Sequence, residues 1–479
     1  MLTRRTLLGT AAAVASAPWL SPVTAESNAS SHASAIACAM QSLPRAAPLA
    51  VAERTAWTLL DALGAMLYAT TLPEAMTAAG YFASSAHRGG IVIPAADLSA
   101  NAAQAAAATA FLIHAAEIDD SDMRGQLRAS AVIMAAALAA AQEADASGAD
   151  FIRAAALGYT LQGRFAAPVG AIQARGWMAS GVWGPPSAAA ATALLKSLPA
   201  DQVSAAISLA GSTSGGLFQY YFDQTEEKRL IVARAARAAI ESAELAAIGE
   251  HGAPHIIEGR AGLYQLFGGV EAPPSTHFTE RLGDLEGPLF VRPKYFAASH
   301  SIIPTLDGLA AVAPQGIDPS NVVRIVVRGD PAWEAVIGEK INSFEAPTTQ
   351  IGAALNFSYV VGLWIARGRV LPTDYTPAAM RDEAILALAR KSAFETALGQ
   401  HLSIEVVLKN GEIIRASAAD PEPDELAPFE RERRLEKFRG LSASRLSEKK
   451  TEELQMHCLD VAKAQSMRDW ARRAQTICA

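Results

Sequence analysis

The chain has 479 residues, of which 51% are hydrophobic and only 6% aromatic. This length suggests two domains, and an apolar fraction dominated by Ala, Leu, Ile and Val favours closely packed helices. With 41 Lys and Arg against 48 Asp and Glu, and no basic tract, the acidic chain is a poor candidate for binding nucleic acid.

Residues 1–25 have the features of a targeting segment. Arg4 and Arg5 precede an apolar run of about 12–15 residues, which is too short to span a bilayer. Val23-Thr24-Ala25 then supplies a small-residue cleavage site. The segment resembles a twin-arginine signal, with an ordinary Sec signal or a lipid-free anchor as the alternatives, and it predicts export to the periplasm. Residues 26–35 are expected to form a flexible polar lead-in.

The next part of the chain, residues 36–271, has helical periodicity almost throughout. Frequent alanine lets helix axes approach closely, so we expect an all-helical bundle. Gly and Pro clusters predict breaks, among them Gly184-Pro185-Pro186. Besides the helix that contains residues 55–67, we expect helices at 100–117, 130–143, 149–164, 187–197, 201–211 and 229–249.

The pattern changes near residue 272, and residues 272–424 predict an α+β domain. Strands are expected at 321–327, 402–408 and 413–416, and Asn410-Gly411 between the last two is a strong hairpin signal. Helices are expected near 300–313, 348–366 and 377–396. The charged segment 425–479 is predicted to be helical again.

Residues 111–130 gather more ionisable groups beside apolar sequence than any other stretch. Glu117, Asp119, Asp120 and Asp122 follow a helical run and are succeeded by two arginines. Four carboxylates within six residues repel one another, so they need either water or a cationic partner. A substrate, a metal or the protein's own Lys and Arg could be that partner, and a solvated helix end is the structural alternative.

Common catalytic and cofactor motifs are missing from the sequence. It contains no P-loop, no dinucleotide-binding glycine fingerprint, no serine hydrolase elbow and no zincin histidine pair. His251 and His255 are separated by Gly252 and Pro254, which disfavours a metal-binding helix face. His114 lies on an apolar helix and fits a buried core histidine better than a general base.

The three cysteines, Cys38, Cys458 and Cys478, have no metal-ligand spacing, and any disulfide pairing stays open. We therefore expect no metal and no cofactor.

Several weak motifs, taken in order, resemble those of the MmgE/PrpD family, which includes 2-methylcitrate dehydratase and cis-aconitate decarboxylase. Together they extend over nearly the whole chain after residue 25. They are Ile118-Asp119-Asp120-Ser121; Gly158-Tyr159 with Arg164; Arg175-Gly176-Trp177; Lys228-Arg229-Leu230; Glu258-Gly259-Arg260-Ala261-Gly262; and Lys294-Tyr295 followed by His300 and Asp307.

The resemblance implies a large all-helical domain, residues 36–271, and a smaller α+β lid, residues 272–424, with the site in the cleft between them. It also implies that residues 425–479 return to pack on the helical domain, and that the protein is a homodimer. No membrane-spanning segment is expected in the mature chain.

The same resemblance implies site residues with distinct roles. The acidic motif maps onto Glu117, Asp119, Asp120 and Ser121, and the later tyrosine of the family onto Tyr359. The expected catalytic residues are His300, Lys228 and Tyr359, and the expected substrate-binding residues are Glu117, Asp120, Ser121, Arg128, Trp177, Arg229 and Lys294. Lys228 and Arg229 could instead neutralise neighbouring acids, and Tyr359 and Trp177 could be ordinary packing residues.

Three histidines of the family pattern are replaced here, by Arg128, Met178 and Ile231. Arginine does not deprotonate usefully and methionine transfers no proton. The sequence therefore predicts altered specificity: a lyase or isomerase that abstracts a proton next to a carboxylate of a small substrate. In this hypothesis His300 is the acid or base, Lys228 and Arg229 hold the anion, and Tyr359 donates a proton. The alternative is a non-catalytic descendant that binds a carboxylate or serves as a scaffold.

Overall fold

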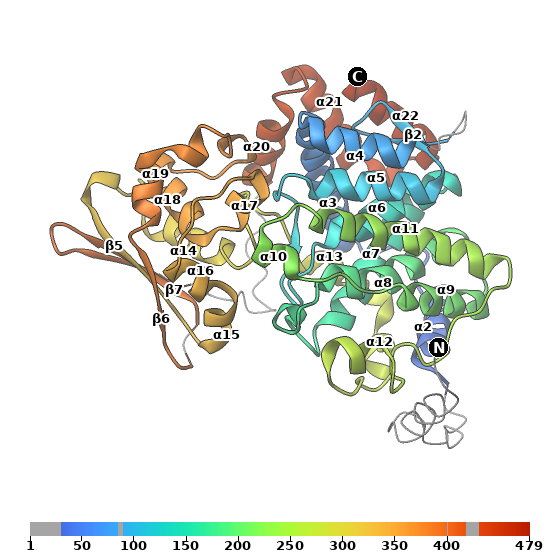
Figure 1. Cartoon of the computed structure of the whole chain (residues 1–479). Coiled ribbons are helices and arrows are strands. Elements are labelled where there is room, and N and C mark those ends of the chain that lie inside the picture. The colour runs from blue at the N-terminus through green and yellow to red at the C-terminus, as the bar shows by residue number, and fades with distance from the viewer. Residues whose placement is uncertain (1–29, 85–89, 400, 418–430) are drawn as a thin grey trace, which may run out of the picture.

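The computed structural model describes residues 30–84, 90–399, 401–417 and 431–479, so the predicted targeting segment lies outside the described residues. A larger, mostly helical part and a smaller α+β part lie side by side (Figure 1). Each has its own hydrophobic core. The predicted fold class is therefore confirmed.

The helical part is built from long helices rich in alanine. The central helix α5 packs against α4, α6 and α11, because its alanines allow close approach. Two-residue strands β3 (Ser121–Asp122) and β4 (Val291–Arg292) pair beside the acidic turn. The helices are α2 (His32–Met40), α3 (Leu49–Ala69), α4 (Pro73–Ala83), α5 (Ala102–His114), α6 (Ala129–Glu143), α7 (Gly148–Ala166), α8 (Ala179–Leu195), α9 (Ala200–Ser212), α10 (Gln219–Asp223), α11 (Lys228–Ala247), α12 (Thr276–Thr279) and α13 (Gly287–Phe290), with a hairpin of β1 (Ile91–Ile93) and β2 (Leu98–Ala100).

The predicted helix break at residues 184–186 is wrong, because α8 continues through Pro185 and Pro186. Two prolines remove the hydrogen bonds that the carbonyls of Gly181 and Val182 would accept inside the helix. The backbone N–H of Gly215 donates to the first carbonyl at 3.0 Å, and the Ser214 hydroxyl donates to the second at 2.8 Å. A neighbouring loop thus replaces the missing donors, and the helix stays intact.

The α+β part contains a four-stranded sheet with the order β6-β5-β7-β8. Strands β5 and β6 are parallel, whereas β5–β7 and β7–β8 are antiparallel. The strands are β5 (Val322–Gly329), β6 (Ser392–Thr396), β7 (Ser403–Leu408) and β8 (Ile413–Ser417), and the helices are α14 (Ile303–Val312), α15 (Pro331–Trp333), α16 (Glu339–Asn342), α17 (Gln350–Leu355), α18 (Phe357–Arg367) and α19 (Glu383–Ala389).

The hairpin predicted at Asn410-Gly411 is confirmed: β7 and β8 pair across it, and Gly411 has a left-handed φ of 83°. The helix predicted over residues 377–396 is partly wrong. A 3-10 turn at Ala379–Arg381 and α19 are helical there, whereas Ser392–Thr396 forms β6 at the edge of the sheet. Residues 392–396 have no strand periodicity of their own, and their parallel pairing with β5 determines that they form a strand.

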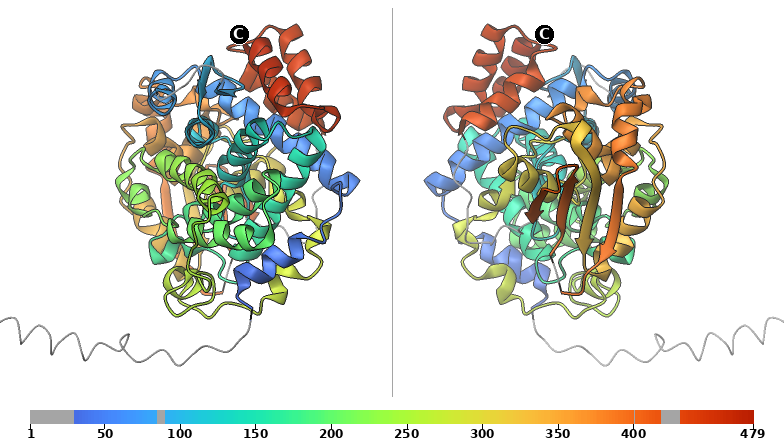
Figure 2. Two further views of the ribbon diagram at one scale, coloured as in Figure 1. Left: turned by 90° about the vertical axis from the view of Figure 1, so that its right-hand side faces the viewer. Right: turned by 90° about the vertical axis from the view of Figure 1, so that its left-hand side faces the viewer.

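The last three helices, α20 (Arg431–Ser442), α21 (Glu448–Leu459) and α22 (Met467–Cys478), contact the helical part through α3 and α6. Both views in Figure 2 show them together at one end of the molecule. A buried ion pair of 2.6 Å between Lys437 and Asp61 ties α20 to α3. Among the described residues, we find no helix with the length and apolarity needed to traverse a bilayer.

Candidate functional site

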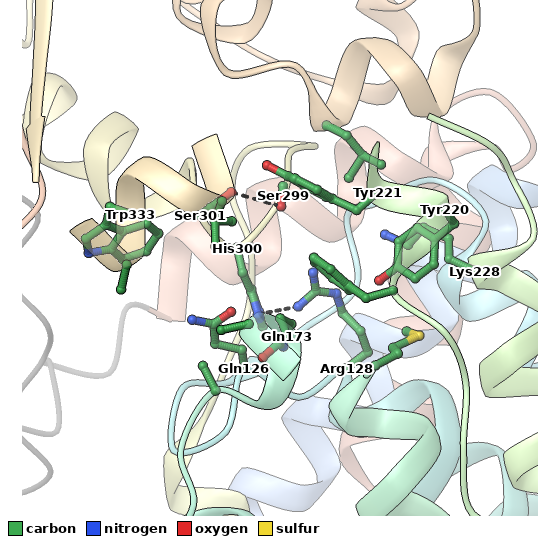
Figure 3. Close-up of a pocket in the computed structure, with 17 residues that line it drawn as sticks. Gln126, Arg128, Gln173, Tyr220, Tyr221, Lys228, Ser299, His300, Ser301 and Trp333 are labelled. Atoms are coloured by element: carbon green, nitrogen blue, oxygen red, sulfur yellow. Dashed lines mark hydrogen bonds between the residues drawn. The ribbon is translucent and has the colours of Figure 1, made fainter. Parts of the chain in front are cut away.

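A cavity of about 200 Å³ lies where the two parts of the molecule meet (Figure 3). The helical part contributes both cationic side chains of its wall, and the α+β part contributes the segment around His300 and the segment around Trp333. The lining residues are Gln126, Arg128, Ala171, Gln173, Ala174, Met178, Phe218, Tyr220, Tyr221, Lys228, Ser299, His300, Ser301, Ala332, Trp333, Val336 and Leu355.

Lys228 is the first residue of α11, and its ammonium is held from behind by Glu117. Its Nζ lies 2.5 Å from Glu117 Oε1, and both side chains are 1% exposed. The Glu117 backbone has a left-handed φ of 56°, which turns the chain at the end of α5. Lys294 lies on the other side, with its Nζ 3.7 Å from Glu117 Oε2 and 3.2 Å from the Glu117 carbonyl oxygen. One carboxylate thus lies between two buried lysines.

The electrostatics of this group favour an ionised acid and a readily deprotonated lysine. Burial would raise the pKa of Glu117, but the charges of Lys228 and Lys294 hold that pKa well below its usual value. Burial lowers the pKa of Lys228 to about 8, although Glu117 opposes the shift. An amine with this pKa can accept a proton near neutral pH.

His300 and Arg128 contact each other in the wall of the cavity. The Arg128 guanidinium has His300 on one side and Tyr220 and Lys228 on the other (Figure 3). Arg128 Nη1 contacts His300 Nδ1. Because a guanidinium can only donate, Nδ1 accepts and the ring proton sits on Nε2. Burial, followed by the charge of Arg128, keeps the pKa of His300 well below its usual value. His300 is therefore neutral, with Nε2–H as a donor.

Asp120 belongs to the same acidic turn but points into the helical core. Its carboxylate accepts hydrogen bonds from the backbone N–H of Ser130, at 3.0 Å, and from the Ser130 hydroxyl. The hydroxyls of Ser130 and Tyr159 are 2.6 Å apart. Burial, reinforced by the charge of Asp61, raises the pKa of Asp120 to about 7. This side chain fixes the start of α6, and it does not line the cavity.

Three residues expected from the sequence, Lys228, His300 and Arg128, line one cavity. Glu117 and Lys294 lie behind Lys228 and set its charge environment. The two halves of the chain therefore share one void that holds both cations and the histidine.

The other expected site residues lie elsewhere, outside the lining of this cavity. Tyr359 is buried in the α+β core beside Tyr375, and burial raises its pKa to about 12. Trp177 packs edge-to-face on Phe267. Arg229 is buried and donates to Glu226 at 3.1 Å. Ser121 lies in β3, opposite a residue of β4, and Asp120 binds Ser130.

Two positions where the chain departs from the family pattern differ in their placement. Met178 lines the cavity, whereas Ile231 packs against Gly181 and Gly216 outside the lining. Trp333 was not predicted as a site residue, because a tryptophan in a short helix after a strand carries no specific signal. Ser299 and Ser301 flank His300, and that adjacency was their only available indication.

Among the described residues, His114, Glu117 and Asp119 offer ligand atoms within 4.8 Å of one another. His114 Nδ1 lies 2.9 Å from Asp119 Oδ2, and His114 Nε2 lies 3.5 Å from Glu117 Oε1, the oxygen that is paired with Lys228. The ammonium would compete directly with a divalent cation there. The group is better explained as an ion-pair cluster that supports Lys228.

The fold and the site define a two-domain protein with a cationic cleft between a helical and an α+β domain. The MmgE/PrpD N-terminal domain model matches residues 35–275, and the C-terminal domain model matches residues 296–461. The chain belongs to the MmgE/PrpD family, as the motifs predicted. It is 27% identical over 376 residues to the cis-aconitate decarboxylase-like protein oryM of Aspergillus oryzae. The aligned region covers 73% of this chain and 77% of that protein.

Proposed function

We propose that this protein is a lyase or isomerase that abstracts a proton next to the carboxylate of a small substrate. The observation that carries the proposal is the convergence of Lys228, Arg128 and His300 on one cavity. A carboxylate needs a cation to hold it, and proton abstraction needs a base that titrates near neutral pH. The family relative whose name refers to cis-aconitate decarboxylase supports the same substrate class.

The geometry supports a different division of roles from the one expected from the sequence. Arg128 binds the substrate carboxylate, because it is the guanidinium in the wall. Lys228 is the base, since its pKa is about 8. His300, neutral with Nε2–H as donor, stabilises negative charge that develops on the substrate. Tyr359 lies outside the cavity lining and has no role in this scheme.

The first step transfers the proton of the carbon next to the carboxylate to the Lys228 amine. The electrons of the broken C–H bond move into the carboxylate group, where Arg128 and His300 stabilise the added charge. In an isomerisation, the Lys228 ammonium returns the proton to another carbon. In a dehydration, it protonates the departing hydroxyl, and water leaves as the double bond forms. Both outcomes restore the neutral amine and need no further reactant.

Solvent deuterium exchange tests the proposal whichever of these reactions the protein catalyses. In D₂O, the wild-type protein is expected to exchange the hydrogen next to the carboxylate in at least one member of a carboxylate panel, detected by NMR. The rate should rise as pH rises through about 8, where Lys228 loses its proton. Lys228→Arg keeps the positive charge beside Glu117 but cannot deprotonate, so exchange should fall about 10³-fold.

Lys340→Arg is the matched control for this experiment. Lys340 donates to the Tyr221 carbonyl at 2.6 Å, next to the cavity wall but outside it. The exchange rate of the Lys340→Arg variant should stay within about two-fold of the wild-type rate. Wild-type exchange rates in Lys228→Arg would remove the base from the scheme and refute the proposal.

A second candidate function is binding of a carboxylate without chemistry. Met178 favours it, because an apolar side chain occupies the wall where the family pattern has a histidine. In that case the panel would stabilise the protein, Arg128→Met would abolish the stabilisation, and no deuterium would enter any bound compound.

We also propose that residues 1–25 direct export by the twin-arginine route. The proposal rests on Arg4-Arg5, the short apolar run and Val23-Thr24-Ala25. Cell fractionation should recover the protein from the periplasm without these residues, and replacing both arginines by lysine should retain it in the cytoplasm. Export that is unaffected by that change would indicate the Sec route instead.

A further inference from the structure

We infer that the cavity selects a substrate with a single carboxylate on a short, largely apolar body, and discriminates against di- and tricarboxylates. This inference rests on the proposed function, because it assumes that the anion binds beside Arg128. It follows from the charges of the wall, its apolar composition and its size.

The wall offers one cation for a substrate carboxylate. Lys228 and Arg128 are the only charged side chains in the lining, and Lys228 is already paired with Glu117 at 2.5 Å. In the described part of the chain, no carboxylate lies within 4 Å of the Arg128 guanidinium, whose only side-chain hydrogen-bond partner is His300. Its buried Nε also has no partner among those residues. One carboxylate would satisfy this guanidinium.

The rest of the wall brings no further positive charge. His300 is neutral because of its lowered pKa, and the amides of Gln126 and Gln173 are uncharged whichever way they are turned. A second carboxylate of the ligand would be removed from water without a cation, which carries a large desolvation penalty. Most of the remaining surface is apolar, from Ala171, Ala174, Met178, Phe218, Ala332, Trp333, Val336 and Leu355.

The volume sets the length of the apolar body. A cavity of about 150 Å³ is large enough to hold benzene. The cavity here measures about 200 Å³, which corresponds to a ligand of about eight to ten non-hydrogen atoms. Trp333 lies on the far side of His300 from Lys228, so the apolar end of the ligand would extend toward Trp333 in the α+β part (Figure 3).

Calorimetric titration with three carboxylates of related size tests the inference at pH 7. The probes are hexanoate, adipate and propane-1,2,3-tricarboxylate, which carry one, two and three carboxylates. Hexanoate is expected to bind at least about ten-fold more tightly than adipate, and the tricarboxylate should bind most weakly. Equal affinities, or a preference for either polyanion, overturn the inference.

Met178→His adds a titratable cation to the apolar wall and provides a gain-of-binding test. The ratio of adipate affinity to hexanoate affinity should rise several-fold at pH 6 and return toward the wild-type ratio at pH 8, where histidine is neutral. Met456→His, on the exposed surface of α21, is the matched control and should leave the ratio unchanged. An unchanged ratio in Met178→His contradicts the inference that the shortage of positive charge in the wall causes the discrimination against a second carboxylate.

The results separate this inference from the proposed function. Deuterium exchange that depends on Lys228, together with a preference for polyanions, would uphold the function and overturn the inference. Tight hexanoate binding without exchange into any compound would do the reverse. If none of the three carboxylates binds, the inference fails, and deuterium exchange across the panel still decides the function.

Discussion

Glu117 and Asp120 lie three residues apart in one turn, and both are almost completely buried, yet their environments are opposite. Glu117 faces two lysines, and their charges hold its pKa well below the usual value despite burial. Asp120 faces hydroxyl groups and the charge of Asp61, and burial raises its pKa to about 7. Burial alone therefore does not decide ionisation here; the nearest charges do.

The two carboxylates position the two cations of the cavity. Glu117 pairs with Lys228 at the first residue of α11. Asp120 binds Ser130 near the start of α6, directly after Arg128, whose backbone N–H donates to Ser180 at 2.7 Å. Each helix start thus presents one cation to the cavity, and one acidic turn supports both. Ionised Glu117 opposes the loss of the proton from Lys228, whereas protonated Asp120 holds the backbone at the start of α6.

Glu117→Gln is expected to have the largest effect on stability. It leaves Lys228 and Lys294 buried without their shared carboxylate, which typically costs about 3–5 kcal/mol of unfolding free energy. Part of this loss should be recovered as pH rises toward 8, because Glu117 raises the pKa of Lys228 and its removal lets this lysine lose its proton below pH 8. Chemical denaturation at pH 6 and pH 8 measures both effects.

Asp120→Asn is the matched control in the same turn. Asparagine preserves the shape and can accept the Ser130 N–H bond, so at pH 6 the change should cost less than about 1 kcal/mol. Comparable destabilisation by both variants would contradict the contrast between an ionised and a protonated acid.

The pH dependence of stability should distinguish Asp120 from every ionised carboxylate of the turn. Its folded-state pKa of about 7 is raised above the unfolded value of about 4, so its stabilising contribution is complete below pH 4 and is lost as pH rises through 7. Between pH 5 and pH 8 the wild-type protein should lose about 2–3 kcal/mol relative to Asp120→Asn. A constant difference between the two proteins across this range would show that Asp120 is ionised throughout.

The sequence predicted the fold more completely than the site. Helical periodicity, the change near residue 272 and the Asn410-Gly411 hairpin depend on local patterns, which the sequence displays directly. The continuation of α8 through two prolines depends on donors from residues 214 and 215, and such tertiary compensation has no local signature. β6 is likewise decided by its neighbour β5.

The predicted site residues were chosen by motif, and the structure places some of them at one cavity and others in the cores of the two parts. Lys228 and His300 were identified by their motifs, and both line the cavity. Tyr359 was placed in the site by the same resemblance, but its helix turns it into the α+β core. The position of Arg128 between His300 and Lys228 depends on how the domains meet, which no spacing in the chain encodes.

Arg128→Met tests whether the guanidinium between these groups provides the carboxylate site, and its effect should be the smallest of the series. Loss of a charge-assisted contact should weaken hexanoate binding about 10–100-fold, measured by calorimetry at pH 7. Removing this neighbouring charge should also raise the pKa of Lys228 above about 8, since Arg128 lowers it, and so move the rise in deuterium exchange to higher pH.

Arg175→Met is the matched control, because the Arg175 Nε donates to the Phe267 carbonyl at 2.9 Å and the residue lies outside the wall. Its affinity and its pH profile should match the wild type. If both arginine variants weaken binding equally, the carboxylate is attracted by the general field of the cleft, and Arg128 is not its specific partner.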